Sequence, residues 1–412
     1  MSCSEFSAGS ASKSDCEVCF VPAAEHGRSA AGLEISLESS VAVLFGRSIK
    51  ERAAAAAAEF GACGSMRIVD DGALDYVVAA RVEAALRMAG LRRGTKAPHA
   101  QPACALRGAS AAQRLRRSRL YMPGNQPDLP INAGLYGADC VLLDLEDSVA
   151  PARKFEARIL VRCLLEQGSG FFGSSEIAVR INPLESPFGH DDLAEIVPAF
   201  PQALIIPKAE SAEQIEACDR EVSELEAGAG IAPRSIHFMP LIETAKGVSQ
   251  AAAIAFASDR TVALCFGAED FRRDLGVERS ADESETFLAR SSIALAAHAA
   301  GIGAQDSVFS NIEDVAGLEA STRRAKALGF DGKGIVHPKQ IAVVHRVFDP
   351  TEAEIEGARR VAEALELAEK EGRGVASLDG KMIDAPVAAR ARRLLERAEA
   401  GHSAGPKSGK RS

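Results

Sequence analysis

The stretch G-A-D-C-V-L-L-D-L-E-D-S-V, residues 137–149, contains the pattern that decides the fold. Its apolar run C-V-L-L does not alternate with polar residues, which is typical of a parallel strand buried on both faces. The run passes into an acidic segment that contains Asp144, Glu146 and Asp147. Pro151 follows and suits the first position of a helix, because a missing N–H costs nothing there. The stretch therefore predicts a buried strand, an acidic loop and a helix.

The same rhythm of strand and helix recurs along the rest of the chain. We expect strands at residues 118–123, 140–145, 176–181, 203–207, 236–242, 261–266, 306–309 and 333–336. The clearest helices are expected at 151–166, 212–226, 245–257, 282–300 and 314–328, with two further helices at 351–372 and 386–400. Eight strands, most followed by a helix, predict a (β/α)₈ barrel with additional C-terminal helices. A doubly wound open sheet is the alternative, but no G-x-G-x-x-G follows the first strand.

A composition break at residues 91–113 divides the chain into two unequal parts. This segment has Pro, Gly, Ala and basic residues but no acidic residue, so we interpret it as a linker. Residues 1–90 predict a small α+β domain, with strands at 16–22, 33–37 and 65–69 and helices at 39–59 and 73–89. Residues 114–400 are expected to form the barrel and its extra helices, and residues 401–412 a flexible tail.

The composition argues against several classes of partner. The net charge of −9 and the lack of a long basic run argue against nucleic acid. No apolar run approaches the roughly 20 residues that span a bilayer, and no signal-peptide pattern is visible, so we expect a cytoplasmic protein without a membrane partner. The nine cysteines form no framework and indicate reduced thiols. Cys16 and Cys19 form a C-x-x-C, but no second pair completes a zinc site.

Charged residues recur where one predicted strand after another ends, which is where a barrel of this kind carries its chemistry. They are Asp144, Glu146 and Asp147, then Arg180 and Asn182, Lys208 and Glu210, Glu243, Glu269 and Asp270, and finally His337 and Lys339. Solvation alone does not explain charges at the ends of five successive strands. The pattern therefore predicts an active site at the barrel mouth. No Ser-His-Asp order, G-x-S-x-G or Walker loop is present, which argues against acyl-enzyme and ATP chemistry.

The acidic character of this ring favours a hard cation. Carboxylates without a His or Cys cluster suit Mg²⁺, which needs only one or two protein carboxylates together with waters and substrate. Glu243 and Asp270 follow neighbouring strands and are the candidate ligands; the alternative for each is an ion pair with Arg180 or Lys208. The two small residues before Glu269, Gly267 and Ala268, are expected to let a ligand approach the backbone closely.

The large part of the chain resembles the citrate lyase β subunit, a member of the aldolase and citrate lyase family of TIM barrels. The resemblance covers about residues 116–400 and is specific, because many motifs occur in the same order. They are R-R-S-R-L-Y-M-P-G (116–124), G-A-D-C-V-L-L-D-L-E-D-S-V (137–149), V-R-I-N (179–182), I-P-K-A-E-S (206–211), L-I-E-T-A-K-G (241–247), F-G-A-E-D-F (266–271), L-G-F-D-G-K-G-I-V-H-P-K-Q-I (328–341) and S-L-D-G-K-M-I-D-A-P-V (377–387).

The resemblance implies a Mg²⁺-dependent retro-Claisen cleavage of a citryl thioester to an acetyl thioester and oxaloacetate. By motif, Glu243 and Asp270 would hold the metal. Arg180 would bind the substrate carboxylate or the developing oxyanion, because a guanidinium suits planar carboxylates. Asp147 and Glu146 would order the metal waters and the substrate hydroxyl.

Other roles follow less directly from the resemblance. Lys208 or a main-chain donor could offset the charge of the enolate, and the general base stays unassigned. The family is typically multimeric, so a homo-oligomer is expected. A transferase α subunit is the expected partner if the likeness to citrate lyase extends to the whole complex.

The small part resembles the citrate lyase acyl carrier, or γ, subunit over about residues 6–90. The matching stretches are A-G-S-A-S-K-S-D (8–15), E-I-S-L-E-S-S-V-A-V-L-F-G (34–46) and D-D-G-A-L-D-Y-V-V-A-A-R-V-E-A-A-L (70–86). In the carrier family, the serine of A-G-T-L-E-S bears a phosphoribosyl-dephospho-CoA arm. An ungapped alignment places Lys13 at that position, and lysine cannot form the phosphodiester.

Three alternatives follow from Lys13. In the first alternative, the arm is attached to Ser14, one residue beyond the expected position, or to Ser12. Alternatively, the domain no longer carries cargo, and the barrel acts on free CoA thioesters such as citryl-, citramalyl- or malyl-CoA. In the third alternative, the domain is a non-enzymatic docking module that recruits the lyase to a transferase subunit.

Overall fold

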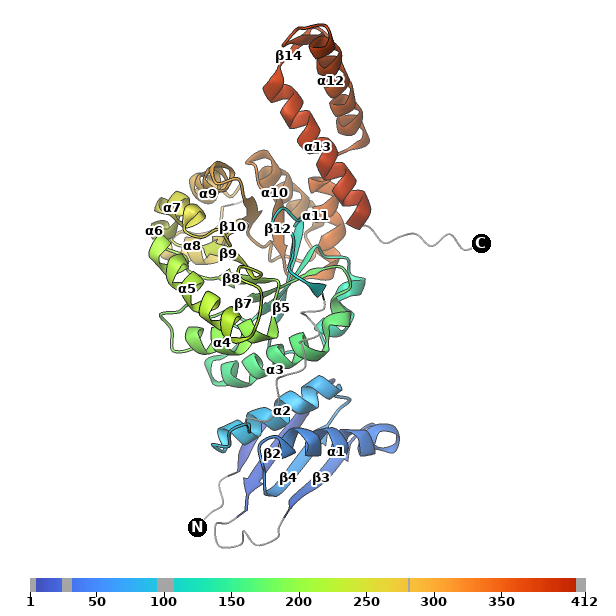
Figure 1. Cartoon of the computed structure of the whole chain (residues 1–412), viewed down its shortest axis with the longest axis vertical. Coiled ribbons are helices and arrows are strands. Elements are labelled where there is room, and N and C mark those ends of the chain that lie inside the picture. Colours follow the sequence, from blue (N-terminus) through green and yellow to red (C-terminus); the bar gives the residue numbers. More distant parts are fainter. Residues whose placement is uncertain (1–4, 24–31, 95–106, 281, 405–412) are drawn as a thin grey trace, which may run out of the picture.

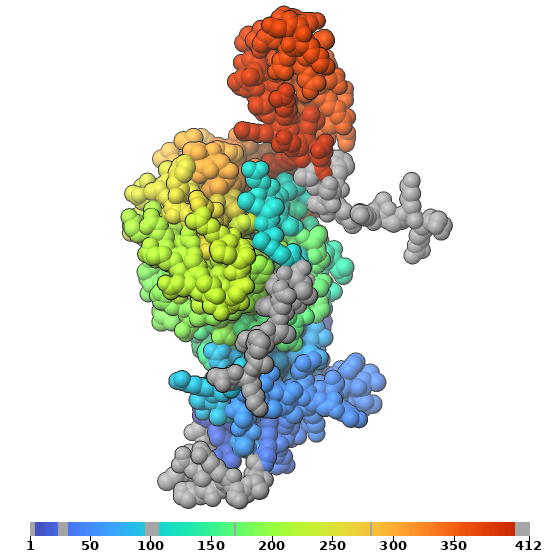
Figure 2. All heavy atoms as spheres, viewed as in Figure 1, coloured from blue at the N-terminus to red at the C-terminus, as the bar shows by residue number. Residues whose placement is uncertain are grey.

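The computed structural model describes residues 5–23, 32–94, 107–280 and 282–404 (Figure 1). A small sheet-and-helix domain lies against one side of a closed barrel, and a helical arm projects from the opposite side (Figures 1 and 2). Most of the predicted linker, residues 95–106, lies outside the described residues.

The barrel confirms the predicted fold class. Eight parallel strands close in the order β10-β11-β12-β5-β6-β7-β8-β9. They are β5 (Ser118–Pro123), β6 (Cys140–Asp144), β7 (Glu176–Arg180), β8 (Ala203–Ile206), β9 (His237–Ile242), β10 (Ala263–Phe266), β11 (Gly303–Asp306) and β12 (Gly332–Ile335). Every residue of β6, β7, β8 and β9 is buried, as their unbroken apolar runs predict.

Helices surround the barrel (Figure 1). They are η3 (Pro130–Leu135), η4 (Pro151–Arg153), α3 (Lys154–Gln167), η5 (Ser169–Phe172), α4 (Gly189–Ile196), η6 (Val197–Ala199), α5 (Ala212–Gly228), α6 (Ala245–Ser249), α7 (Ala251–Phe256), α8 (Ala268–Leu275), η7 (Ser284–Thr286), α9 (Phe287–Ala299), α10 (Val315–Ala327), η8 (Pro338–Gln340) and α11 (Ile341–Phe348). The sequence did not predict α4, α8 and α11, because helices of eight residues are too short to show a clear period. The expected helix at 245–257 is two helices, separated at Gln250.

The seventh barrel strand was predicted wrongly. It runs over Gly303–Asp306, so the predicted strand at 306–309 begins where the real one ends. The strand sequence G-A-Q-D is polar, whereas the apolar S-V-F lies in the loop that follows. The buried Asp306 carboxylate is compensated by Arg290, 2.5 Å away, and by Lys333, 2.6 Å away. This internal charge compensation permits a polar strand in a buried position.

The small domain is a four-stranded mixed sheet with two helices, in the order β1-β2-β4-β3. Its elements are β1 (Phe6–Gly9), β2 (Cys16–Pro22), β3 (Leu33–Ser39), α1 (Ala42–Ala58), β4 (Gly64–Asp70) and α2 (Asp75–Met88). This confirms the α+β prediction, although β1, with four residues, was not predicted. Cys16 and Cys19 are three residues apart on β2 and therefore point to opposite faces of the sheet, where they cannot share a metal.

The C-terminal arm comprises α12 (Glu352–Lys370), β13 (Ala376–Leu378), β14 (Lys381–Ile383) and α13 (Ala385–Ala404). Its two long helices were predicted and its short hairpin was not. The arm has a core of its own, formed by Leu365, Ile383 and Ala388. Because α13 continues to Ala404, the predicted tail at 401–412 begins too early, and residues 405–412 lie outside the described residues. No helix in the described part of the chain is long and apolar enough to cross a membrane.

Candidate active site at the barrel mouth

The carboxyl ends of β6, β7, β8 and β9 bring the predicted polar residues together. Asp144 and Arg180 end neighbouring strands and are paired in register. Both oxygens of Asp144 accept hydrogen bonds from Arg180, at 2.6 Å from Nε and 2.7 Å from Nη2. Burial would raise the pKa of Asp144, but its bonds to Arg180 lower it below the ordinary value. Asp144 therefore positions Arg180, a role that the register of two charged strand ends could have indicated.

The remaining donor of Arg180 lies between two more carboxylates. Its Nη1 is 2.9 Å from Oε2 of Glu146 and 3.5 Å from Oδ2 of Asp147. Glu146 is buried, whereas the side chain of Asp147 is 55% exposed. Burial raises the pKa of Glu146 despite the opposing effect of Arg180. Glu146 is therefore a member of the cluster, while Asp147 lies at its solvent side.

Lys208 connects two of the carboxylates. Its Nζ is hydrogen-bonded to Glu146, and its backbone N–H donates to Oε1 of Glu243 at 2.9 Å. Its φ of 49° lies in the left-handed region, which is uncommon for residues other than glycine. Burial would lower the pKa of Lys208, but the bond to Glu146 raises it. Lys208 is therefore a protonated donor at the mouth.

Glu243 is a buried carboxylate of the site with a strongly raised pKa. It is 1% exposed, and burial, Glu146 and Asp270 together raise its pKa to about 8. A Cβ on Gly267 would lie 2.6 Å from Oε2 of Glu243, so only glycine leaves room for this side chain. The expectation that Gly267 admits a ligand to the backbone stays a prediction, and the side chain that approaches it in the structure is Glu243.

Asp270 lies in the first turn of α8, beyond the end of β10, and its Oδ1 is 2.6 Å from Nη2 of Arg273. After burial and Glu146, its charge is a further cause of the raised pKa of Glu243. Glu243 is therefore the carboxylate of this group that forms no ion pair among the described residues.

Several other predicted residues have local partners instead. Two of the acids pair with nearby side chains: the exposed Glu269 with Arg272, and Glu210 with Thr244 and Lys246. Asn182 forms hydrogen bonds with Asp192 and with the Leu145 carbonyl. Lys339 pairs with Glu313, and His337 caps η8. These contacts stabilise loops around the mouth and leave Glu146, Glu243 and Asp270 as its acidic centre.

The acidic centre fits a hard divalent cation. No group of three or more His, Cys, Asp or Glu side chains within the described ranges is arranged as a complete metal site. Mg²⁺ does not need one, because it keeps several waters and takes only one or two protein carboxylates. Burial, Glu146 and Asp270 raise the pKa of Glu243, and a bound cation would oppose this effect.

The second candidate site is the β1–β2 turn, residues 10–15. Ser12 is exposed, and its Oγ lies 2.8 Å from Oγ of Ser10, which donates to Oδ2 of Asp15 at 2.9 Å. Ser14 is half-buried, has a φ of 62°, and donates its backbone N–H to the Asp71 carbonyl at 2.8 Å. Of the two candidate serines, only Ser12 combines an exposed hydroxyl with a hydrogen-bonded connection to a carboxylate.

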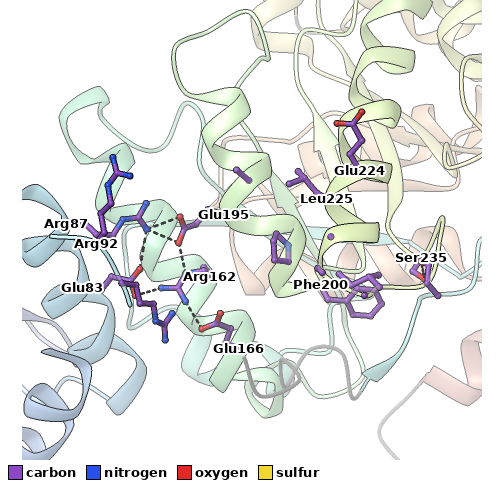
Figure 3. Close-up of a pocket in the computed structure, with 18 of the residues that line it drawn as sticks. Glu83, Arg87, Arg92, Arg162, Glu166, Glu195, Phe200, Glu224, Leu225 and Ser235 are labelled. Atoms are coloured by element: carbon purple, nitrogen blue, oxygen red, sulfur yellow. Dashed lines mark hydrogen bonds and ion pairs between the residues drawn. The ribbon is translucent and has the colours of Figure 1, made fainter. Parts of the chain in front are cut away.

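A pocket of about 1320 Å³ lies away from the mouth, where the small domain meets the barrel (Figure 3). Two of its arginines are held by acids: Arg87 pairs with Glu195 at 2.9 Å, and Arg162 pairs with Glu83, Glu166 and Glu195. These pairs join α2 to α3 and α4. The pocket is therefore a hollow in the seam between two domains, and it contains none of the predicted site residues.

Comparison with known proteins agrees with both parts of the chain. The family model for HpcH/HpaI aldolase/citrate lyase matches residues 117–338, and that for the malonate decarboxylase delta subunit, an acyl carrier protein family, matches residues 4–89. Citrate lyase subunit beta of Haemophilus influenzae is 42% identical over 288 residues, which cover 70% of this chain and 98% of that protein. (3S)-malyl-CoA thioesterase of Cereibacter sphaeroides is 35% identical over 69% of this chain and 95% of its own length.

A solved structure shows the same relationship. The protein CitE of Mycobacterium tuberculosis, in complex with magnesium, acetoacetate and coenzyme A, matches with a TM-score of 0.56 and 35% identity, covering 70% of this chain and all of that one. The match of the barrel to the family model and the likeness to the β subunit lead to one conclusion. The chain belongs to the HpcH/HpaI aldolase/citrate lyase family, as an oxo-acid carbon–carbon lyase of the citrate lyase β type preceded by an acyl-carrier-like domain.

Proposed function

We propose that the barrel cleaves a citryl thioester into an acetyl thioester and oxaloacetate in the presence of Mg²⁺. The observation that carries the proposal is Glu243, a buried carboxylate that forms no ion pair among the described residues, beside an arginine and a lysine that already pair with Glu146. The likeness to citrate lyase subunit beta supports the reaction class, and the related structure with magnesium, acetoacetate and coenzyme A supports the kind of ligand.

Glu243 and Asp270 would hold the cation. When bound, Mg²⁺ would supply a Lewis acid that polarises the substrate hydroxyl and the adjacent carboxylate. Glu243 reaches this position because Gly267 leaves room for it and the Lys208 N–H orients one of its oxygens.

The other residues of the mouth bind the substrate and stabilise charge. Asp144 fixes the plane of Arg180, so that Nη1 is the donor available to a substrate carboxylate that displaces Glu146 or Asp147. In the reaction the hydroxyl loses its proton, the adjacent C–C bond breaks, and its electron pair forms a thioester enolate, which is then protonated. We assign Lys208 to the stabilisation of this enolate, because its ammonium lies within the acidic cluster. Glu146 and Asp147 would order the water and the substrate hydroxyl.

For the carrier-like domain, we propose Ser12 as the attachment point of a phosphoribosyl-dephospho-CoA arm. Its hydroxyl is exposed and connects through Ser10 to the Asp15 carboxylate. Ser14 is the less favourable candidate, since its residue is half-buried and its amide is already bonded to Asp71. The intact mass of protein isolated from cells that possess the arm-transfer enzymes tests this assignment, and Ser12→Ala should abolish the added mass while Ser14→Ala should retain it.

A second candidate function is the cleavage of free citramalyl- or malyl-CoA, with a carrier-like domain that bears no arm. The observation that favours it is Lys13 at the expected serine position, and the likeness to (3S)-malyl-CoA thioesterase supports a free CoA thioester as the ligand. An unmodified mass in the experiment above would select this alternative.

The lyase proposal is tested with the full chain, Mg²⁺ and free citryl-CoA, by measuring oxaloacetate. We expect cleavage that Asp270→Ala abolishes, and parallel assays with citramalyl- and malyl-CoA rank the substrates. Failure to cleave any of the three thioesters with any divalent metal would exclude the proposed activity.

As partners, we propose a transferase α subunit, which would load the acyl group, and further copies of the same chain. Exposed apolar side chains on neighbouring helices α7 and α9 support self-association, since Phe256, Phe287 and Leu295 are each more than half exposed.

A further inference from the structure

We propose that Glu156 fixes the carrier turn on the rim of its own barrel, so that an acyl group carried on this turn is delivered to the same chain. The inference rests on the proposed carrier and lyase functions. The carrier turn is the β1–β2 turn, residues 10–15. The inference also concerns the helix α2 and the first turn of the barrel helix α3, which lies against α2 (Figure 1).

A buried chain of alternating charges connects the two domains. Asp15, the residue that follows Ser14, accepts two hydrogen bonds from Arg81, at 2.9 Å from Nε and 3.0 Å from Nη2. Nη1 of Arg81 is 3.3 Å from Oε2 of Glu156, and Glu156 also pairs with Arg153. Asp15, Arg81 and Glu156 are each at most 2% exposed. Pairs of this kind hold their partners in one geometry, because removing one member leaves a buried charge without a partner.

The backbone of the turn is bound at the same point. The Gly9 N–H donates to Oε2 of Glu156 at 2.7 Å, and the Gly9 carbonyl accepts from Nη2 of Arg153 at 3.1 Å. A Cβ at Gly9 would lie 2.0 Å from the Cys16 carbonyl oxygen and 2.9 Å from Arg81, so the close approach requires glycine. The N–H and the carbonyl of Gly9, the residue just before the turn, are therefore both bound by barrel residues.

The first turn of α3 also holds the active-site loop. Lys154, between Arg153 and Glu156, donates from Nζ to the carbonyls of Leu145 and Glu146, both at 2.9 Å. A barrel helix begins on the side where the preceding strand ends, so this turn of α3 lies on the mouth side. The carrier turn and the loop that carries Glu146 thus share one support, which places a group on the turn at the rim of the mouth.

The consequence is delivery within one chain. A tethered acyl group has a high effective concentration at the mouth next to its attachment point, whereas a freely moving carrier domain would divide its time among many orientations. Glu156 is a positioning residue in this arrangement, because it contacts the turn and not the reacting atoms. Loss of Glu156 should slow the cleavage of turn-borne citryl groups and leave the cleavage of free citryl-CoA unchanged.

The test compares Glu156→Met with Glu195→Met in the full chain. Glu195 is a matched control, because it is also a barrel carboxylate in the seam with α2 but pairs with Arg87, away from the turn. We expect Glu156→Met to reduce single-turnover cleavage of the turn-borne group about tenfold or more, with Glu195→Met close to wild type. Glu156→Gln retains an acceptor for Gly9 and should restore part of the rate.

Amide hydrogen exchange at Gly9 gives a measurement that does not depend on activity. Glu156→Met should remove the protection of this amide, and Glu195→Met should leave it intact. Unchanged protection of the Gly9 amide in Glu156→Met would overturn the proposed attachment of the turn to the barrel. Because this measurement needs no activity, it distinguishes a failure of this proposal from a failure of the proposed lyase function.

Two further outcomes would overturn delivery within one chain. One is a native protein that carries no arm on the turn. The other is full activity in a mixture of Glu243→Gln chains with loaded turns and Ser12→Ala chains with intact barrels, because the acyl group must then pass between chains.

Discussion

The barrel mouth and the carrier turn are both built from buried charges, but the charges are compensated at only one of them. At the turn, acids and arginines alternate from Asp15 through Arg81 to Glu156. At the mouth, Asp144, Glu146 and Asp270 each pair with a cation, while Glu243 forms no ion pair among the described residues and its pKa rises to about 8. The difference teaches that the paired charges at the turn hold the chain together, whereas the unpaired Glu243 at the mouth fits the proposed role of a metal ligand.

The largest expected effect comes from a substitution at the mouth that removes the unpaired carboxylate. Glu243→Gln removes a proposed metal ligand and should reduce citryl-CoA cleavage by about a hundredfold to a thousandfold. The same substitution should increase the thermal stability of the metal-free protein, because it removes a buried carboxylate from an acidic cluster. Activity assays and calorimetric unfolding check the two effects, and a loss of both activity and stability would contradict the contrast.

The second prediction concerns the turn, where a substitution removes the cation between two buried acids. Arg81→Met leaves Asp15 buried without a cation and leaves Glu156 with Arg153 alone, so it should lower the free energy of unfolding by about 3–5 kcal/mol. Denaturant titration measures this change. Arg47→Met is the control, because Arg47 pairs with Glu51 on the exposed surface of the same domain and should have no measurable effect. Equal effects of the two substitutions would show that the buried chain of charges has no special role.

The third prediction concerns pH. The pKa of Glu243 in the folded protein, about 8, exceeds its ordinary value of 4.5. The folded state therefore binds more protons than the unfolded state between these values, and this group reduces stability progressively as the pH rises from about 4.5 to about 8. Unfolding of wild type and Glu243→Gln across this range, without divalent metal, should show a pH-dependent difference that saturating Mg²⁺ reduces. A constant difference would contradict the assigned pKa.

The fourth and smallest effect concerns Gly267. A Cβ at this position would lie 2.6 Å from Oε2 and 2.7 Å from Cβ of Glu243, so Gly267→Ala should displace Glu243 without removing its charge. We expect weaker activation by Mg²⁺, by about tenfold, and a smaller loss than in Glu243→Gln. Titration of activity with Mg²⁺ checks this order, and an unchanged midpoint would show that the position of Glu243 is not critical.

The sequence predicted the barrel because its strands are continuous apolar runs, and it failed at β11, where Gln305 and Asp306 occupy a buried strand. A polar strand can be recognised only when its partners are known, and Arg290 and Lys333 are distant in the sequence. The short helices α4, α8 and α11 were missed because eight residues show little periodicity.

The candidate site could be predicted as a set of residue types at strand ends, but not as a set of contacts. Strand ends indicated Arg180, Lys208 and Glu243, since a parallel barrel gathers such residues at one mouth. The role of Asp144 follows from the register of two charged strand ends, whereas the role of Glu156 depends on distances across elements and no local pattern reveals it. Charge compensation, which separates the mouth from the turn, is likewise a property of the fold.

The central claim is that Glu243 is largely protonated at neutral pH and gives up its proton when Mg²⁺ binds. The most direct test is calorimetric titration of the full chain with Mg²⁺ at pH 7 in two buffers of different ionisation enthalpy. We expect release of about one proton per bound ion in wild type and none in Glu243→Gln, with Glu156→Gln behaving as wild type. Binding of Mg²⁺ without proton release, or release that persists in Glu243→Gln, would contradict the account.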